Sequence, residues 1–188
     1  MDIVELWMIY WPKWTGKSFA VFVLFIVVLV AVLSRMLFSG KMKKTEVWAA
    51  GILAVYIMLV FESTVFTRTT YPDYNFRLEV FWSYRWGVAV YGGEMIREVV
   101  LNICMLIPVG VLLPVAIVDR FSGKCGAALA LSLVCGFCCS AAIEFLQLFF
   151  RRGIFEFDDM IHNTAGVVVG YQIWNLLSRC FEKRTETE

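Results

Sequence analysis

The stretch VFVLFIVVLVAV, residues 21–32, decides the fold class of this chain. It belongs to a run that carries no charge from Ser18 to Ser34 and stays apolar past Arg35 to Phe38. A helix of about 20 residues crosses the roughly 30 Å hydrocarbon core of a bilayer. A membrane barrel would need alternating apolar and polar residues, and the stretch has no such alternation. It therefore predicts a transmembrane helix.

Four further apolar stretches follow the first, and the composition agrees with them. Hydrophobic residues make up 60% of the 188 residues and charged residues 18%, whereas soluble domains average about 45–50% and about 25%. We therefore expect an all-α fold, a polytopic helical membrane protein with five transmembrane helices in a single domain, residues 1–188. A net charge of +1 gives no electrostatic case for nucleic acid binding. The expected spans are about 18–38, 47–66, 99–118, 125–150 and 160–178.

The segment before the first span, residues 1–14, is rich in tryptophan. Trp7, Trp11 and Trp14 stand among charged residues, and aromatic rings favour the headgroup layer of a membrane. We expect an N-terminal interfacial segment. The first span is too long and too apolar for a cleaved signal peptide, so we expect it to be retained.

Lysine and arginine set the expected orientation. Five spans put nine of them on the face of the 35–46 and 119–124 loops and the C-terminal tail, and eight on the other face. Their density is uneven, because four crowd the loop beside the first two spans, where the positive-inside bias counts most. We expect this loop and the C-terminus in the cytoplasm and the N-terminus outside. The four crowded residues are Arg35, Lys41, Lys43 and Lys44.

The polar residues of the spans gather at ends that share one membrane face. Up-and-down threading brings the start of an odd span and the end of an even span to the same side, which is the outer face in the expected orientation. Ionisable residues within a membrane are expensive and mark functional sites by default. The aromatic-rich segment 67–98 is expected to lie across this mouth of the bundle. The predicted ligand-binding cluster comprises Asn102, Glu144, Gln147, Arg151, Arg152, Asp158, Asp159, Asn163 and Arg68.

Helical spacing places many of these residues on stripes of three helices, because residues three or four apart share one helix face. Gly166 and Gly170 form a small-xxx-small pattern that lets a neighbouring helix approach closely. We expect the three helices to meet along these stripes. The stripes are Ser140, Glu144, Gln147 and Arg151; Asp159, Asn163, Gly166 and Gly170; and Asn102, Leu106 and Gly110.

Each polar group also has a structural interpretation that stays open at this point. A buried ion pair between Glu144 and one of the three arginines would fix the helix register. The two aspartates would stabilise the free N–H groups and the dipole at a helix start. The two asparagines would only join helices, a common use of amides in membranes.

The histidine and the cysteines favour structural roles. His162 is the only histidine, and a lone histidine is a weak signal for catalysis or metal binding. Cys135, Cys138 and Cys139 lie in the middle of a span, where cysteine behaves as a small hydrophobe. We expect no metal site, no cofactor and no disulfide framework.

An ordered set of motifs resembles the VanZ-like family of membrane proteins. The string EFLQLFFRRGIFEFDDMIHNTAGVVVG, residues 144–170, combines an E-x-x-Q helix end with an R…D-D-x-x-x-N-x-x-G-x-x-x-G turn and helix. The segment NICMLIPVG, residues 102–110, resembles the family's N…P-x-G pattern, and FWSY at 81–84 and the Thr67-Arg68 pair also fit. The resemblance covers about residues 47–171. It implies a bacterial plasma membrane location and, since the founding member is associated with teicoplanin resistance, a contribution to glycopeptide resistance.

Three function classes remain open. The first is a cell-envelope protein whose outer cavity binds a membrane lipid or a lipid-linked cell-wall precursor, and so affects a glycopeptide antibiotic indirectly. The second is a small lipid or solute transporter, although the cytoplasmic halves of the spans offer no polar path. The third is an intramembrane enzyme that uses Glu144 or Asp159 as acid or base. The sequence favours the first class.

Overall fold

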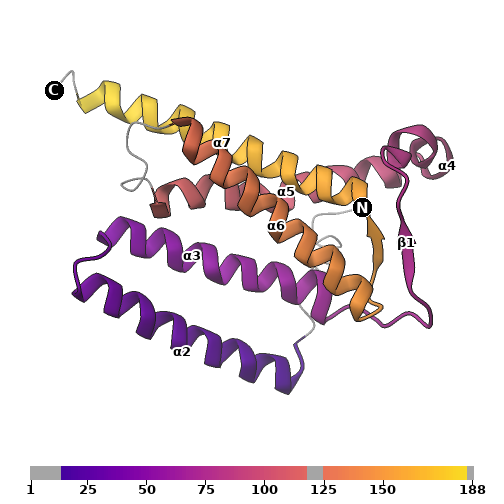
Figure 1. Ribbon diagram of the computed structural model, residues 1–188, viewed down its shortest axis with the longest axis horizontal. Helices are drawn as coiled ribbons and strands as arrows, with labels where there is room; N and C mark the ends of the chain where they lie inside the picture. The colour runs from indigo at the N-terminus through magenta and orange to yellow at the C-terminus, as the bar shows by residue number, and fades with distance from the viewer. Residues whose placement is uncertain (1–13, 118–124, 186–188) are drawn as a thin grey trace.

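The structure, a computed structural model, describes residues 14–117 and 125–185. Long helices run up and down along the longest axis of the molecule (Figure 1). The predicted all-α, polytopic helical membrane fold is confirmed. The predicted interfacial segment lies outside the described residues, apart from Trp14. The long helices are α2 (Gly16–Phe38), α3 (Lys44–Phe61), α5 (Gly93–Ile117), α6 (Cys125–Phe149) and α7 (Phe157–Thr185).

The helices match the five expected spans, with differences at their ends. Helix α5 begins at Gly93, earlier than expected, and a π-helix, η1 (Glu62–Phe66), continues α3. Among the described residues, α2, α3 with η1, α5 and α6 are long and apolar enough to cross a membrane. Helix α7 is as long, but it is more polar than the other four because it carries residues such as His162 and Asn163.

The threading brings the polar helix ends together, as expected. The end of α3, the start of α5, the end of α6 and the start of α7 lie at one end of the bundle (Figure 1). Here β1 (Asn75–Arg77) pairs in parallel with β2 (Ile154–Glu156), a contact that the sequence did not predict. We call this end of the bundle the sheet end.

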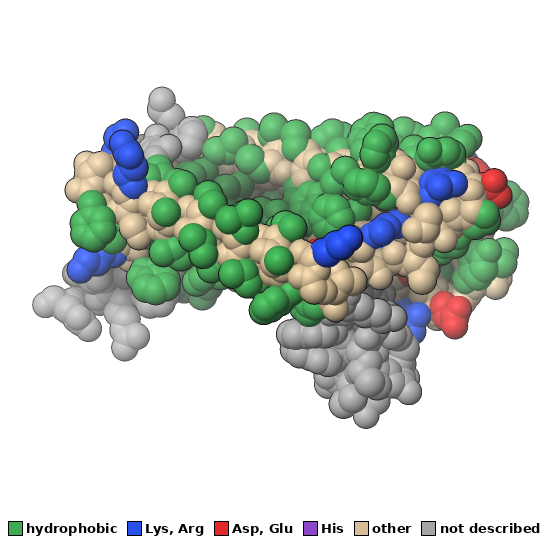
Figure 2. Space-filling view, turned by 90° about the horizontal axis from the view of Figure 1, so that it is seen from below, with side chains coloured by type: hydrophobic (Ala, Val, Ile, Leu, Met, Phe, Trp, Pro, Cys, Tyr) green, Lys and Arg blue, Asp and Glu red, His purple; other side chains and the backbone are tan. Residues whose placement is uncertain are grey.

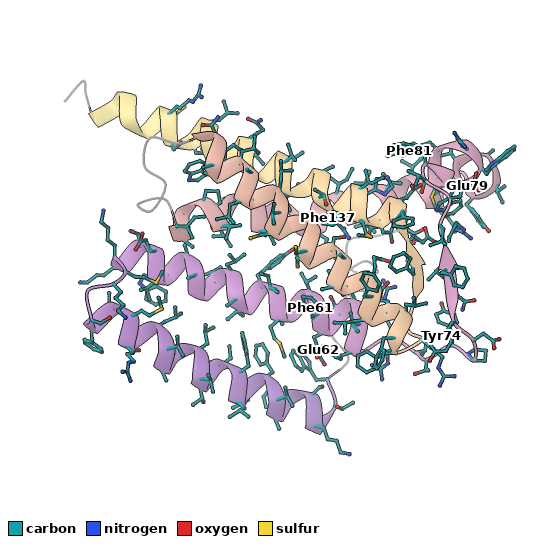
Figure 3. All side chains as sticks on the ribbon, viewed as in Figure 1. Phe61, Glu62, Tyr74, Glu79, Phe81 and Phe137 are labelled. Carbon is teal, nitrogen blue, oxygen red and sulfur yellow. The ribbon has the colours of Figure 1, made fainter. Side chains whose placement is uncertain are left out.

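The aromatic segment before α5 is folded onto the sheet end. Besides β1 it forms the π-helix η2 (Ser83–Gly87) and the short helix α4 (Val88–Tyr91). Figure 3 shows Tyr74, Glu79 and Phe81 of this segment at the sheet end, whereas Phe137 lies partway along α6. The expectation that the segment lies across the mouth of the bundle agrees with this position.

Glycines bring α5 and α7 into close contact. A Cβ atom on Gly166 would overlap the carbonyl oxygen of Ile103, and one on Gly170 would overlap that of Ile107. On the facing helix, Gly110 meets the α7 backbone equally closely. Small residues allow such backbone approach between membrane helices. The prediction that Gly166 and Gly170 lie against a neighbouring helix is confirmed.

The interior joins α3, α5 and α7 around Leu53, Leu106, Val109 and Val167. The face of the molecule that carries α2 is mostly apolar on its outside, because hydrophobic side chains cover much of its surface (Figure 2). In lipid such a surface is stable, since the surrounding hydrocarbon is as apolar as the side chains. The buried contacts of α3, α5 and α7 thus hold together the helices whose ends form the sheet end.

Candidate functional site

A cavity of about 570 Å³ opens at the sheet end between α3, α5, α6 and α7. Such a volume is typical of small-ligand sites. One part of its wall is apolar, with Tyr56, Leu59, Val60, Leu101, Cys104 and Met105. The other part is polar, with Ser63, Thr64, Arg68, Glu98, Asn102, Gln147, Glu156 and Asp159.

Four of the predicted site residues line this cavity. Asp159 lies in the first turn of α7 and accepts a hydrogen bond of 2.7 Å from Nδ2 of Asn102 on α5. Gln147 donates to the carbonyl oxygen of Thr64 over 3.1 Å, which ties α6 to η1. Arg68 is exposed on the same cavity. The sequence pattern thus brings together residues from three helices and the segment after η1.

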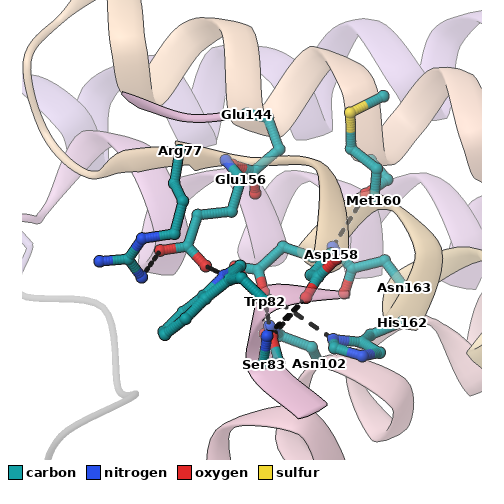
Figure 4. A network of polar contacts seen from close by, with 12 residues as sticks. Arg77, Trp82, Ser83, Asn102, Glu144, Glu156, Asp158, Met160, His162 and Asn163 are labelled. Atoms are coloured by element: carbon teal, nitrogen blue, oxygen red, sulfur yellow. Dashed lines mark hydrogen bonds and ion pairs between the residues drawn. The ribbon is translucent and has the colours of Figure 1, made fainter. Parts of the chain in front are cut away.

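Glu144 is buried behind the cavity and does not line it. Only 2% of its surface is exposed, and its Oε2 accepts a hydrogen bond of 3.0 Å from the backbone N–H of Glu156 (Figure 4). Among the described residues, no ion pair joins Glu144 to Arg68, Arg151 or Arg152. The buried ion pair considered from the sequence is therefore replaced by a bond to the backbone. Glu144 holds β2 in place under the cavity.

Glu156 is a cavity residue that the sequence did not single out. Its Oε1 lies 3.1 Å from Nη1 of Arg77, and its Oε2 accepts a hydrogen bond of 2.9 Å from Nε1 of Trp82 (Figure 4). The Arg77 guanidinium also stacks over the Trp82 ring at 3.6 Å. Burial raises the pKa of the Glu156 carboxyl above its usual range. Glu156 thus connects the cavity wall to the aromatic segment.

Asp158 anchors the aromatic segment instead of facing the cavity. Its carboxylate accepts hydrogen bonds from the backbone N–H of Phe81 at 2.5 Å and of Ser83 at 2.9 Å. It also accepts a hydrogen bond of 2.6 Å from the Ser83 hydroxyl. Phe81 has a positive φ of 62°, a conformation uncommon outside glycine and stabilised here by the bonds to Asp158. Asp158 is therefore a support for η2 as well as an acidic residue in the first turn of α7.

The two arginines after α6 donate to carbonyl groups at the end of η1 and in the segment that follows it. Nη1 of Arg151 donates to the carbonyl oxygen of Pro72 over 2.9 Å. Nη1 of Arg152 donates to the carbonyl oxygens of Val65, at 3.3 Å, and of Phe66. Neither arginine lines the cavity. Arg152 thus satisfies carbonyl groups at the end of η1, and Arg151 holds the backbone next to Tyr71, which lines the cavity.

Asn163 and His162 lie deeper, beside the start of α7. Nδ2 of Asn163 donates a hydrogen bond of 2.9 Å to the Ser140 hydroxyl, and this bond joins α7 to α6. Nε2 of His162 lies 2.8 Å from the Tyr84 hydroxyl, and its Nδ1 lies 4.0 Å from Oδ1 of Asp159. His162 therefore lies between a cavity carboxylate and the aromatic segment, and its Nδ1 has no hydrogen-bond partner among the described residues.

Neither metal clusters nor disulfides occur in the part of the chain that the structure describes. No group of three His, Cys, Asp or Glu side chains there could hold a metal ion. The described cysteines are free thiols: Cys104, Cys135, Cys138, Cys139 and Cys180. The side chains that line the cavity thus supply carboxylates, amides, hydroxyls, the Cys104 thiol and the Arg68 guanidinium.

Glu98 is a further cavity residue that the predicted cluster omitted. It lies one helical turn before Asn102, on the same stripe of α5, so helical spacing could have found it. Glu156 had no comparable signal, because its position depends on the pairing of β1 with β2.

The sequence comparison agrees with this arrangement of helices and motifs. A family model described as VanZ/LLP1 matches residues 19–178, a longer range than the motifs alone suggested. No curated protein and no solved structure matches the chain. Because the matched range takes in the five long helices and the whole sheet end, the chain belongs to the VanZ/LLP1 family.

Proposed function

We propose that this protein binds the polar head of an amphiphile in the cavity at the sheet end. The observation that carries the proposal is the divided wall of the cavity, polar at Arg68, Glu98 and Asp159 and apolar at Tyr56 and Leu101. A ligand that matches both parts carries a charged head and a hydrocarbon tail. Membrane lipids and lipid-linked cell-wall precursors have this chemistry.

The charges suggest how the head would be held. Arg68 is exposed toward the cavity, and a guanidinium binds phosphate through two parallel N–H groups. Glu98 and Asp159 would accept hydrogen bonds from an ammonium or from sugar hydroxyls. Glu156 contributes less, because Arg77 and Trp82 already occupy its oxygens. Arg68 together with Glu98 and Asp159 therefore favours a head group that carries both a phosphate and a hydrogen-bond donor.

The location of the site completes the proposal. In the bacterial plasma membrane, an N-terminus outside would place the sheet end on the outer face, where cell-wall precursors and glycopeptides meet. Glycopeptide resistance would then follow from a changed amount or accessibility of the bound amphiphile. Impermeant thiol labelling of whole cells tests the orientation: Thr69→Cys should react and Lys41→Cys should not. The reverse pattern would move the site to the cytoplasmic face.

An intramembrane enzyme is a second candidate, favoured by one observation. Asp159 faces the cavity, and His162 lies 4.0 Å behind it, with the Tyr84 hydroxyl beyond. Nδ1 of His162 has no hydrogen-bond partner among the described residues, and one water in this gap would complete a chain that moves a proton to or from a bound substrate. Mass spectrometry of phospholipid incubated with the protein tests this candidate. New products formed by the parent but not by Asp159→Asn would favour the enzyme.

Native mass spectrometry with a soluble short-chain lipid tests the binding proposal. Dihexanoyl phosphatidylethanolamine supplies a phosphate and an ammonium, and we expect one molecule to bind per chain. Arg68→Ala should lose this binding. Arg85→Ala is the matched control, because Arg85 is an exposed arginine of the same end whose partner is Glu79 at 3.9 Å. Equal binding by the two variants would contradict the proposal.

A further inference from the structure

A second hollow runs between α2 and α3, and its chemistry differs from that of the cavity. It has a volume of about 760 Å³ and almost entirely apolar walls. From Lys44 to Leu59 along α3 it extends for about 22 Å, at 1.5 Å per residue. We call it the α2–α3 groove. Residues of α2 that line it include Ile26, Leu29, Val30, Leu33 and Leu37.

The groove meets the cavity at two residues of α3. Tyr56 and Leu59 line both spaces. The Tyr56 hydroxyl donates a hydrogen bond of 2.7 Å to the carbonyl oxygen of Met105, which directs its ring toward α5. The apolar wall of the cavity thus continues directly into the apolar wall of the groove.

Helix α2 leaves the groove open because it packs loosely. None of its residues is buried, and the helix lies beside α3 at the edge of the bundle (Figure 1). Gly51 of α3 faces α2 closely, because a Cβ atom there would lie 3.2 Å from Cδ1 of Leu33. On either side of Gly51, side chains such as Trp48, 73% exposed, border the open space.

We propose that the α2–α3 groove holds the hydrocarbon tail of the same amphiphile whose head lies in the cavity. This inference rests on the proposed function and names the rest of its ligand. The shared wall at Tyr56 and Leu59 lets one molecule occupy both spaces, and the apolar lining suits hydrocarbon. The length of the groove suits one long acyl or prenyl chain. Helix α2 thereby becomes part of the binding site.

The test uses phosphatidylethanolamine that carries a photoreactive diazirine at the end of one long acyl chain. After illumination in detergent, mass spectrometry of peptides locates the label. We expect the label on groove residues of α2 and α3, such as Leu33 and Trp48, and little on Val28, which is exposed on α2 outside the groove lining.

Two variants fill the groove without touching the cavity. Gly51→Phe and Ile52→Trp should lose most of the groove label, because their rings take the space of the tail. Both should keep binding to dihexanoyl phosphatidylethanolamine, whose tails are too short to extend along the groove from Leu59 to Ile52, about 10 Å away. The matched control is Gly126→Phe on α6, where a Cβ atom meets nothing within 4 Å. Ile52 is exposed, so its variant should fold even if Gly51→Phe does not.

The outcomes separate the tail site from the head site. Groove label that persists in both filled variants, or label spread equally over Val28, would overturn the inference and leave the proposed function intact. A parent protein that fails to bind the short-chain lipid would overturn both. A groove occupied by a second copy would appear as peptide crosslinks between two chains through α2, and this result would also overturn the inference.

Discussion

Helices α2 and α7 differ in composition and in position. Helix α2 is apolar throughout its middle and has no buried residue. Helix α7 carries Asp158, His162 and Asn163, and all three are buried. In water the more apolar helix would be expected inside. In a membrane, polar groups find their hydrogen-bond partners inside the protein, and small residues lie where helices pack closely. Lipid covers the apolar surface. Hydropathy therefore identifies a span, and polar stripes identify a helix that packs closely against its neighbours.

The largest effect that we expect concerns the contact between α5 and α7. Gly170→Leu would force a side chain into the carbonyl oxygen of Ile107, so the two backbones must separate. We expect a loss of about 3 kcal/mol or more of stability, at or above the upper range of overpacking. Thermal unfolding in detergent measures it. Gly126→Leu on α6 has open space around it and should melt like the parent. Similar melting of the two variants would show that α5 and α7 do not approach each other closely at Gly170.

The next effect concerns the buried support of the sheet end. Glu144→Ala removes the acceptor of the Glu156 backbone N–H and should cost about 1–3 kcal/mol, the penalty of an unsatisfied buried donor. Glu144→Gln keeps an oxygen for this bond and should cost much less. If Glu144→Gln instead destabilises the protein as strongly as Glu144→Ala, the charge itself is needed and an ion pair must exist. Thermal unfolding of both variants decides between these cases.

A matched pair of valines tests the comparison of α2 and α7 directly. Val167 on α7 is 0% exposed and Val28 on α2 is 53% exposed. Val167→Ala should cost about 1–2 kcal/mol, because the lost methyl groups leave a cavity. Val28→Ala should stay within about 0.5 kcal/mol of the parent, as surface substitutions do. Equal costs would mean that α2 packs against something more ordered than lipid.

The smallest effect concerns one hydrogen bond between helices. A double-mutant cycle on Asn163→Ala and Ser140→Ala should give a coupling energy of about 0.6 kcal/mol, typical of interhelical bonds in membranes. Unfolding in a denaturing detergent provides the four stabilities. A coupling of zero would show that the two side chains do not meet across α6 and α7.

The sequence was sufficient for the helices and for the end at which the polar groups gather. Apolar length predicts spans, and spacing by three or four residues placed Asn102, Gln147 and Asp159 on the faces that meet. The same spacing reaches Glu98, but a span that begins at residue 99 leaves that glutamate in a loop. The expected start of the helix, rather than the spacing of its polar residues, caused the omission of Glu98.

The sequence did not predict the contacts of side chains whose partner is a backbone group or a residue of a distant strand. Glu144, Arg151 and Arg152 suggested ion pairs because they are charged, yet each bonds to peptide groups that no side-chain pattern reveals. Strands β1 and β2 have three residues each and pair across a long stretch of chain. Strands of that length carry too little periodicity to be recognised, so the role of Glu156 required the structure.

The central claim is that the cavity at the sheet end holds the head of an amphiphile. A cryo-electron microscopy map of the protein, extracted together with its surrounding membrane lipids into nanodiscs, tests it most directly. We expect density for a phosphate within hydrogen-bonding distance of Arg68 and for a hydrogen-bond donor beside Asp159, continuous with a tail toward Tyr56. A cavity that contains only water, or that closes around the protein's own side chains, would show that the protein does not bind an amphiphile there.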